Sequence, residues 1–76
     1  MKVIVITKAR PLENETYFGV ASNVKNAEKL IRNKYPHMRK IDGGYSSDKN
    51  NEYFFFLKEE EVIWFLERIE KNEWFE

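Results

Sequence analysis

The sequence predicts a small α+β domain with the element order ββαββα, in which two helices pack on a four-stranded, largely antiparallel sheet. Two observations carry this prediction. Short segments rich in β-branched and aromatic residues, bounded by turn residues, are typical of strands. Two longer segments, which begin near residues 24 and 59, instead repeat their apolar residues at helical spacing. With 76 residues, the chain is expected to form one domain over residues 1–76.

The first half of the chain predicts a pair of strands followed by a helix. Residues 2–8 form a β-branched run with apolar side chains on both faces, and residues 16–21 form a second strand after a polar loop. Ser22 or Asn23 caps the helix that follows. This helix ends directly before Pro36, because a proline disfavours helical backbone in the residue that precedes it.

The second half of the chain predicts two more strands. Residues 38–46 form a weak strand that is broken or bulged at Gly43-Gly44. The polar segment 47–51 then makes a turn. Residues 52–58 form the strongest strand of the chain, with aromatic side chains on both of its faces.

The second helix is predicted to begin at the acidic run Glu59–Glu61, where carboxylates complement the positive end of the helix dipole. Its core stripe comprises four apolar residues at helical spacing: Val62, Phe65, Leu66 and Ile69. At about 100° per residue, Trp64 lies about 200° from Val62, on the opposite face of the helix.

A large apolar ring on the outer face of a helix is costly to leave in water, so Trp64 predicts a docking partner. The predicted partner-binding surface combines apolar contacts with a charged rim: Trp64, Ile63 and Trp74, with Glu60, Glu67 and Lys71 around them. The alternative is a local contact, in which Trp64 folds over Arg68 as a cation–π pair or tucks under the C-terminal residues.

The second face of the predicted sheet allows two arrangements. If both helices pack on one face, the other face exposes either the odd or the even residues of the segment 3–6, together with aromatic side chains of residues 53–57. Such an apolar face is unusual for a monomer, so this arrangement predicts a homodimer or a bound partner. If the helices cover opposite faces, the sheet needs no partner.

The formal net charge of zero hides an asymmetry between the halves of the chain. Residues 1–42 carry nine Lys and Arg against four Asp and Glu, a net charge of +5, and residues 43–76 carry four against nine, a net charge of −5. Neutrality argues against a nucleic-acid binder that relies on bulk charge. Nucleic-acid binding remains a second hypothesis, because the first helix carries a basic stripe of Lys25, Lys29 and Arg32. Four aromatic residues would stack bases if they lay on an open sheet face: Tyr17, Phe18, Tyr45 and Tyr53.

The sequence contains no motif for catalysis, for a metal or for a cofactor, and we expect none of these. His37 is the one histidine, and no nucleophile stands at a spacing that would make a catalytic pair with it. Gly43-Gly44 lacks the frame of a phosphate-binding loop. Because the chain has no cysteine, and the apolar run Val3–Ile6 is too short for a signal peptide or a membrane span, we expect a cytoplasmic protein.

A resemblance to known proteins lies in three segments that together cover roughly residues 3–57: VIVITK, TYFGVASNVKNAEKLI and EYFFFL. These segments resemble small accessory proteins encoded by phages and mobile elements of low-GC Gram-positive bacteria. The resemblance implies a protein that binds and modulates a host or phage factor, and it transfers no catalytic residue. The expected function is therefore a non-enzymatic protein-interaction module that acts by surface occlusion, as a homodimer or as the small partner of a larger protein.

Overall fold

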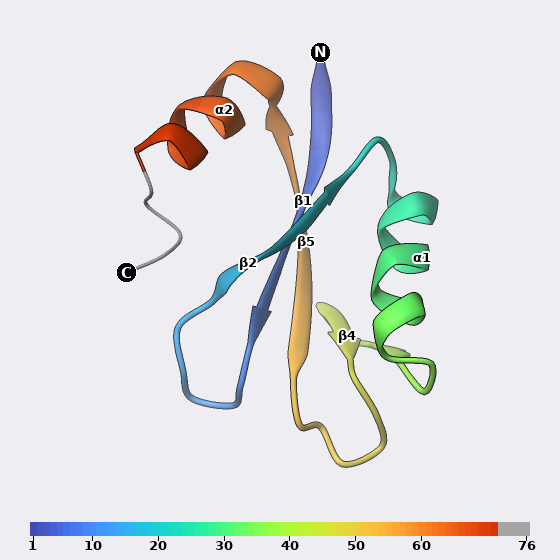
Figure 1. The fold of residues 1–76 in the computed structure, drawn as a ribbon. Coiled ribbons are helices and arrows are strands. Elements are labelled where there is room, and N and C mark those ends of the chain that lie inside the picture. The colour runs from blue at the N-terminus through green and yellow to red at the C-terminus, as the bar shows by residue number, and fades with distance from the viewer. Residues whose placement is uncertain (72–76) are drawn as a thin grey trace.

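The computed structural model describes residues 1–71 as five strands and two helices. The strands are β1 (Lys2–Ala9), β2 (Thr16–Ala21), β3 (Arg39–Ile41), β4 (Gly44–Ser46) and β5 (Phe54–Glu61), and the helices are α1 (Val24–Lys34) and α2 (Val62–Glu70). All five strands join one antiparallel sheet in the order β2-β1-β5-β4-β3 (Figure 1). The α+β class is confirmed, but the prediction of four strands is wrong.

The additional strand comes from the segment 38–46, for which the sequence predicts one bulged strand. This segment forms a hairpin instead, in which β3 and β4 pair antiparallel and Ile41 lies opposite Gly44. Asp42 and Gly43 make the turn, and Gly43 has a φ of 85°, which glycine adopts without the steric cost of a Cβ. The dipeptide Asp-Gly is itself a hairpin signal, and it marks the turn better than the pair of glycines does.

β1 and β5 form the middle of the sheet and pair along the length of β1, beginning with Lys2 opposite Glu61. Val5 and Ile6, which point to opposite faces of β1, are both fully buried. The reason is visible in Figure 1, because α1 and α2 lie on opposite sides of the sheet. Of the two arrangements that the sequence allows, the structure therefore adopts the one in which the helices lie on opposite faces, although Phe56 on the α2 side of β5 remains 36% exposed.

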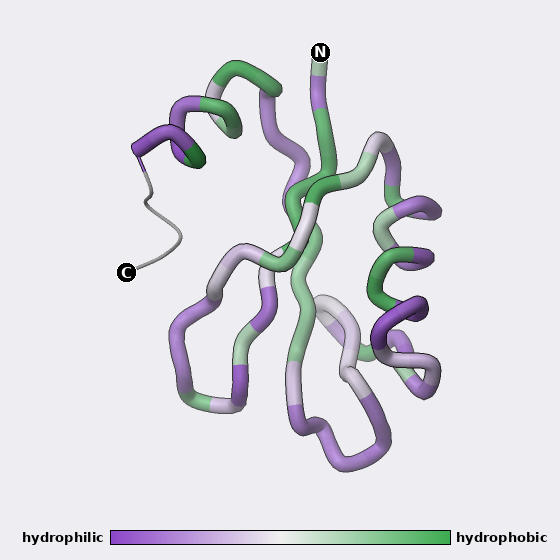
Figure 2. Tube along the Cα trace, in the orientation of Figure 1, coloured by the Kyte–Doolittle hydropathy of each residue, from purple (hydrophilic) through white to green (hydrophobic). Residues whose placement is uncertain are grey.

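The main core lies between α1 and the sheet. Its buried members come from one face of the sheet and one side of the helix: Ile4, Ile6, Ala27, Ile31, Tyr45 and Phe55. Figure 2 shows the apolar residues of α1 on the side toward the sheet and the hydrophilic ones outside. Asn23 caps this helix, as one of the two predicted caps, and its Oδ1 accepts a hydrogen bond from the backbone N–H of Asn26 at 2.8 Å.

β5 runs to Glu61, so the predicted helical position of the acidic run Glu59–Glu61 is wrong. Pairing with β1 holds this run in the strand, and the Glu59 carboxylate forms an ion pair with Lys2 Nζ at 3.3 Å. α2 begins at Val62, whose backbone N–H donates to the carbonyl of Met1 at 3.0 Å. A carboxylate near a helix N-terminus contributes only about 0.3–1 kcal/mol, which is less than continued backbone pairing with a central strand provides.

Candidate protein-binding surface

α2 rests on the sheet through its one buried side chain, Phe65. The Phe65 ring contacts the ring of Tyr17 on β2, with the centroids 5.9 Å apart and the planes tilted by 40°. Val62 and Ile69 lie on the same side of the helix and are partly buried. The predicted core stripe is therefore right for these three residues of α2, but it is wrong for Leu66, which is exposed.

Arg68 sets the rotation of α2 over the sheet. Its Nη1 donates a hydrogen bond to Glu60 Oε2 at 3.3 Å, and its Nη2 forms a second contact with Oε1 of the same carboxylate. This paired contact compensates for the desolvation of Glu60, which is only 5% exposed. Leu66 lies on the other flank of Phe65 and is exposed.

Glu60, a predicted member of the charged rim, lines a surface hollow together with Trp64. The residue lies in β5 rather than on the helix, and its buried carboxylate is occupied by Arg68. Helical periodicity does not describe the position of Glu60, because the chain is still extended at this residue.

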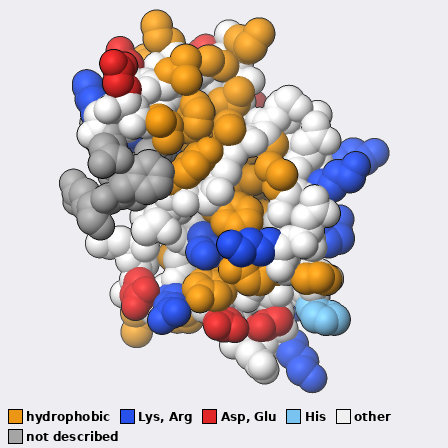
Figure 3. All heavy atoms as spheres, in the orientation of Figure 1, with side chains coloured by type: hydrophobic (Ala, Val, Ile, Leu, Met, Phe, Trp, Pro, Cys, Tyr) orange, Lys and Arg blue, Asp and Glu red, His pale blue; other side chains and the backbone are white. Residues whose placement is uncertain are grey.

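Three large apolar side chains of α2 remain in solvent, and we refer to them as the α2 apolar surface: Ile63 (65% exposed), Trp64 (59%) and Leu66 (57%). Ile63 and Leu66 are three residues apart and share one flank of the helix, while Trp64 occupies the other. Figure 3 shows hydrophobic side chains gathered over α2 and continuing toward the neighbouring edge of the sheet. Single exposed apolar residues are ordinary, whereas a group of three on one short helix is not.

Trp64 lines two shallow hollows in the surface. One, of about 440 Å³, continues onto the end of β5, and the other, of about 210 Å³, is formed with residues one and two turns further along α2. The predicted neighbours Glu67 and Lys71 line this smaller hollow, and both are exposed. Trp74, which is predicted to add apolar contact, lies outside the described residues.

The basic stripe predicted to bind nucleic acid is exposed along α1 and consists of Lys25, Lys29 and Arg32. Arg32 Nη2 lies 3.6 Å from the sulfur of Met38, and this contact holds its side chain against the end of the helix. The aromatic residues expected to stack bases on an open face instead pack against other rings or lie in the core: Tyr17, Phe18, Tyr45 and Tyr53.

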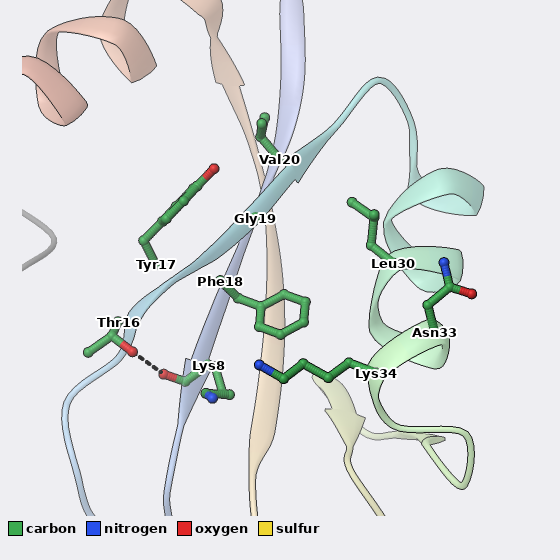
Figure 4. A pocket seen from close by; sticks show the side chains of 9 residues that line it. All are labelled: Lys8, Thr16, Tyr17, Phe18, Gly19, Val20, Leu30, Asn33 and Lys34. Atoms are coloured by element: carbon green, nitrogen blue, oxygen red, sulfur yellow. Dashed lines mark hydrogen bonds between the residues drawn. The ribbon is translucent and has the colours of Figure 1, made fainter.

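A groove of about 790 Å³ between β2 and α1 was not predicted. In Figure 4 the Phe18 ring points from β2 toward α1, and Leu30 points back from α1 toward β2. Lys8 and Lys34 lie at one end, with their Nζ atoms 5.9 Å and 6.0 Å from the centroid of the Phe18 ring. Two sequence features point to such a site: β2 contains no charged residue, and a helix follows it directly.

The titratable groups of the described chain form no reactive cluster. Within residues 1–71, no group of three or more His, Asp or Glu side chains is placed to hold a metal ion. His37 is exposed in the loop after α1. Burial, together with a hydrogen bond that the Tyr45 hydroxyl donates to Glu28 Oε2 at 2.5 Å, raises the pKa of Tyr45 to about 12. Over the same residues, neither helix is long and apolar enough to cross a membrane.

Residues 1–71 form both candidate surfaces, which are the α2 apolar surface and the groove between β2 and α1. No protein-family model, curated protein or solved structure matches the chain, so no residue role carries over from a relative.

Proposed function

We propose that this protein is an interaction module that binds a larger protein through α2 and occludes part of its surface. The observation that carries the proposal is the α2 apolar surface, in which three large side chains on a nine-residue helix are each more than half exposed. Interfaces draw most of their binding energy from a few such anchors, among which tryptophan is enriched. Trp64 is therefore the anchor, and Ile63, about 100° from Trp64 around the helix, extends the apolar contact toward Leu66 on the other flank.

The charges beside Trp64 supply orientation. Glu67 and Lys71 are exposed, carry opposite charges and line a hollow with Trp64. Rim charges influence the association rate and the choice of partner more than the affinity. The partner would present an apolar pocket for the indole, with a basic group facing Glu67 and an acidic group facing Lys71.

A larger partner fits this surface better than a second copy of the chain does. The case for a homodimer came from a sheet face without a helix, and a helix lies on each face (Figure 1). A two-fold dimer through α2 would also bring the acidic halves of two chains together, since residues 43–76 carry a net charge of −5. Like charges placed opposite one another oppose association, whereas a partner with a basic rim is attracted.

The proposal is tested by photo-crosslinking from a single position. A benzophenone amino acid replaces Trp64 in the protein expressed in its source cells, and a matched variant carries it at Val24, an apolar α1 residue that is 49% exposed. We expect a crosslinked product of defined mass from position 64 and none from position 24. The captured protein is then purified, and its affinity is measured for the unmodified chain and for Trp64→Ala.

A loss of affinity of at least about tenfold for Trp64→Ala supports α2 as the contact, because hot-spot truncations cost about 2 kcal/mol or more. A crosslink between two copies of the chain would replace the larger partner with a homodimer. If positions 64 and 24 gave the same pattern of products, the α2 apolar surface would not be a binding surface.

A second candidate function, nucleic-acid binding by α1, is favoured by one observation. The basic stripe of Lys25, Lys29 and Arg32 lies on the opposite side of the sheet from α2, so the carboxylates of that helix do not repel a nucleic acid bound there (Figure 1). Binding of this kind falls steeply with salt, so a labelled oligonucleotide should bind at low salt and lose affinity with Lys29→Glu. No binding at low salt would remove this candidate.

A further inference from the structure

The two edges of the sheet differ in how well they are protected. β3, at one edge, is only three residues long and contains Arg39 and Lys40. Short length and exposed charges are the usual devices that stop an edge strand from pairing with another chain. β2, at the other edge, is six residues long and contains neither a charge nor a proline. Among residues 1–71 it pairs with β1 alone, with one register shift at Phe18, which has no Cα partner in β1. The outer side of β2 therefore carries backbone N–H and C=O groups that no strand of residues 1–71 pairs with.

The groove beside β2 has a recess at Gly19. A Cβ placed on this residue would lie 3.9 Å from Ile6 Cδ1 and 4.0 Å from Leu30 Cδ1, which are ordinary contact distances. The absent side chain thus leaves a floor of Ile6 and a wall of Leu30, and Figure 4 shows Leu30 pointing across to β2 at this level. The recess accepts one small apolar side chain from above the strand.

One end of the groove carries two lysines, Lys8 and Lys34, that have no ion-pair partner within residues 1–71. The ammonium groups of Lys8 and Lys34 approach the same Phe18 ring, and Lys8 Nζ also lies 4.7 Å from the centroid of Tyr53. Two like charges that share one ring repel each other, and a carboxylate placed between them would relieve the repulsion.

We infer that β2 and α1 form a second binding site, separate from the α2 apolar surface, for an extended acidic segment of a partner protein. The segment adds to the sheet along β2, and its backbone pairs with the outer N–H and C=O groups of that strand. Alternate side chains face α1, so that a small apolar residue enters the recess at Gly19 and an Asp or Glu reaches Lys8 and Lys34.

A peptide fits these features better than a single-stranded nucleic acid does. On either side of the register shift at Phe18, the outer N–H and C=O groups of β2 are those that another polypeptide backbone pairs with, and a nucleic acid has no equivalent ladder. Single-stranded nucleic acids are bound through aromatic rings that lie open for stacking, whereas Phe18 packs edge-on against Phe55 at a centroid distance of 5.0 Å. The acidic residue of the segment supplies the negative charge that the lysines require.

The experiment uses the whole chain and a phage-displayed library of random peptides. We expect the selected peptides to share an acidic residue at a constant position, with a small apolar residue near it and no proline between them. The affinity of a fluorescein-labelled selected peptide is then measured by titration. The backbone amide resonances of the protein are recorded as the peptide is added. The shift changes should be concentrated in β2 and in residues 30–34 of α1, and slowed amide exchange should appear at alternate residues of β2.

Matched variants test the charge and the recess separately. Lys8→Glu/Lys34→Glu should lower the affinity for the acidic peptide by at least about tenfold. A peptide with Lys in place of the acidic residue should regain the lost affinity for this variant. Lys25→Glu/Lys29→Glu changes the net charge equally, but on residues of α1 outside the groove, and should alter affinity by less than about twofold. Gly19→Val should block the recess, and circular dichroism verifies that each variant is folded.

If the double variant at Lys8 and Lys34 does not fold, Lys34→Glu alone carries the charge test, because that side chain is exposed on α1. Failure to enrich acidic peptides, shift changes that map to α2, or unchanged affinity in Gly19→Val would each overturn the inference. So would tighter binding of an oligothymidine at the same residues. Trp64→Ala should leave peptide binding intact, so the two sites are tested independently.

Discussion

Arg68, in the second half of α2, holds the buried carboxylate of Glu60, which lies in the strand that leads into the same helix. Arg68→Met leaves that carboxylate buried without its partner, and we expect a loss of about 3 kcal/mol in the free energy of unfolding, measured by urea denaturation. The double variant Glu60→Leu/Arg68→Met should recover most of the loss, because it removes the buried charge as well. A loss below about 0.5 kcal/mol in the single variant would show that the pair does not hold α2 in place.

The neighbouring residues Trp64 and Phe65 should respond differently to truncation. Phe65→Ala removes the buried ring that contacts Tyr17 and should destabilise the fold by about 3–5 kcal/mol. Trp64→Ala removes an exposed ring and should change stability by less than about 1 kcal/mol, while it abolishes binding of the partner. Thermal melts of the two variants decide this, and a large loss of stability for Trp64→Ala would make Trp64 a core residue.

The raised pKa of Tyr45 predicts a loss of stability in alkali. Burial, assisted by Glu28, holds this pKa at about 12 in the folded state, against about 10 in an unfolded chain. Below pH 10 both states keep the proton, so Tyr45 adds no pH dependence there. Between about pH 10 and 12 the unfolded state loses the proton first, so stability should fall by up to about 1.4 kcal/mol per pH unit.

The contribution of Tyr45 is isolated by comparing the unmodified chain with Tyr45→Phe over that pH range. The phenylalanine variant should be less stable by about 1 kcal/mol at neutral pH, because it loses the hydrogen bond to Glu28. Its stability should then decline less steeply above pH 10. Parallel curves for the two proteins would mean that Tyr45 ionises as readily in the folded state as in the unfolded chain.

Two glycines of the sheet differ in their tolerance of a side chain. A Cβ on Gly44 would lie 2.4 Å from the carbonyl oxygen of Phe55, so Gly44→Ala should force β4 away from β5 and cost about 1–3 kcal/mol. Gly19→Ala meets only ordinary contacts and should cost less than about 1 kcal/mol. Chemical denaturation of both variants provides the comparison, and equal losses would contradict it.

The elements that the sequence predicts well are those with local signals. β1 is a β-branched run, and α1 lies between an Asn cap and a proline. β3 and β4 have three residues each, which is too short for a periodic pattern, and they depend on pairing with each other and with β5. The acidic run Glu59–Glu61 has the composition of a helix start, but its partner strand lies at the other end of the described chain. Local preference does not reveal such a partner.

In the candidate surfaces, too, local sequence patterns predict some features, whereas others depend on contacts between distant segments. The exposure of Trp64 agrees with helical periodicity, which depends only on neighbouring residues. The burial of Glu60 depends on a contact between a helix and a strand, which periodicity does not describe. The groove beside β2 depends on strand order, because only that order makes β2 an edge and sets α1 against it.

The two middle strands of the sheet come from distant parts of the chain, since Lys2 pairs with Glu61 and Ala9 with Phe54. During synthesis, β1 leaves the ribosome early, yet its full-length neighbour is complete only when residue 61 has emerged. Contacts between such distant segments form late and slowly. Nascent chains that stop before β5 would lack the strand that pairs along the length of β1, so the apolar side chains of β1 stay exposed until residue 61 has emerged.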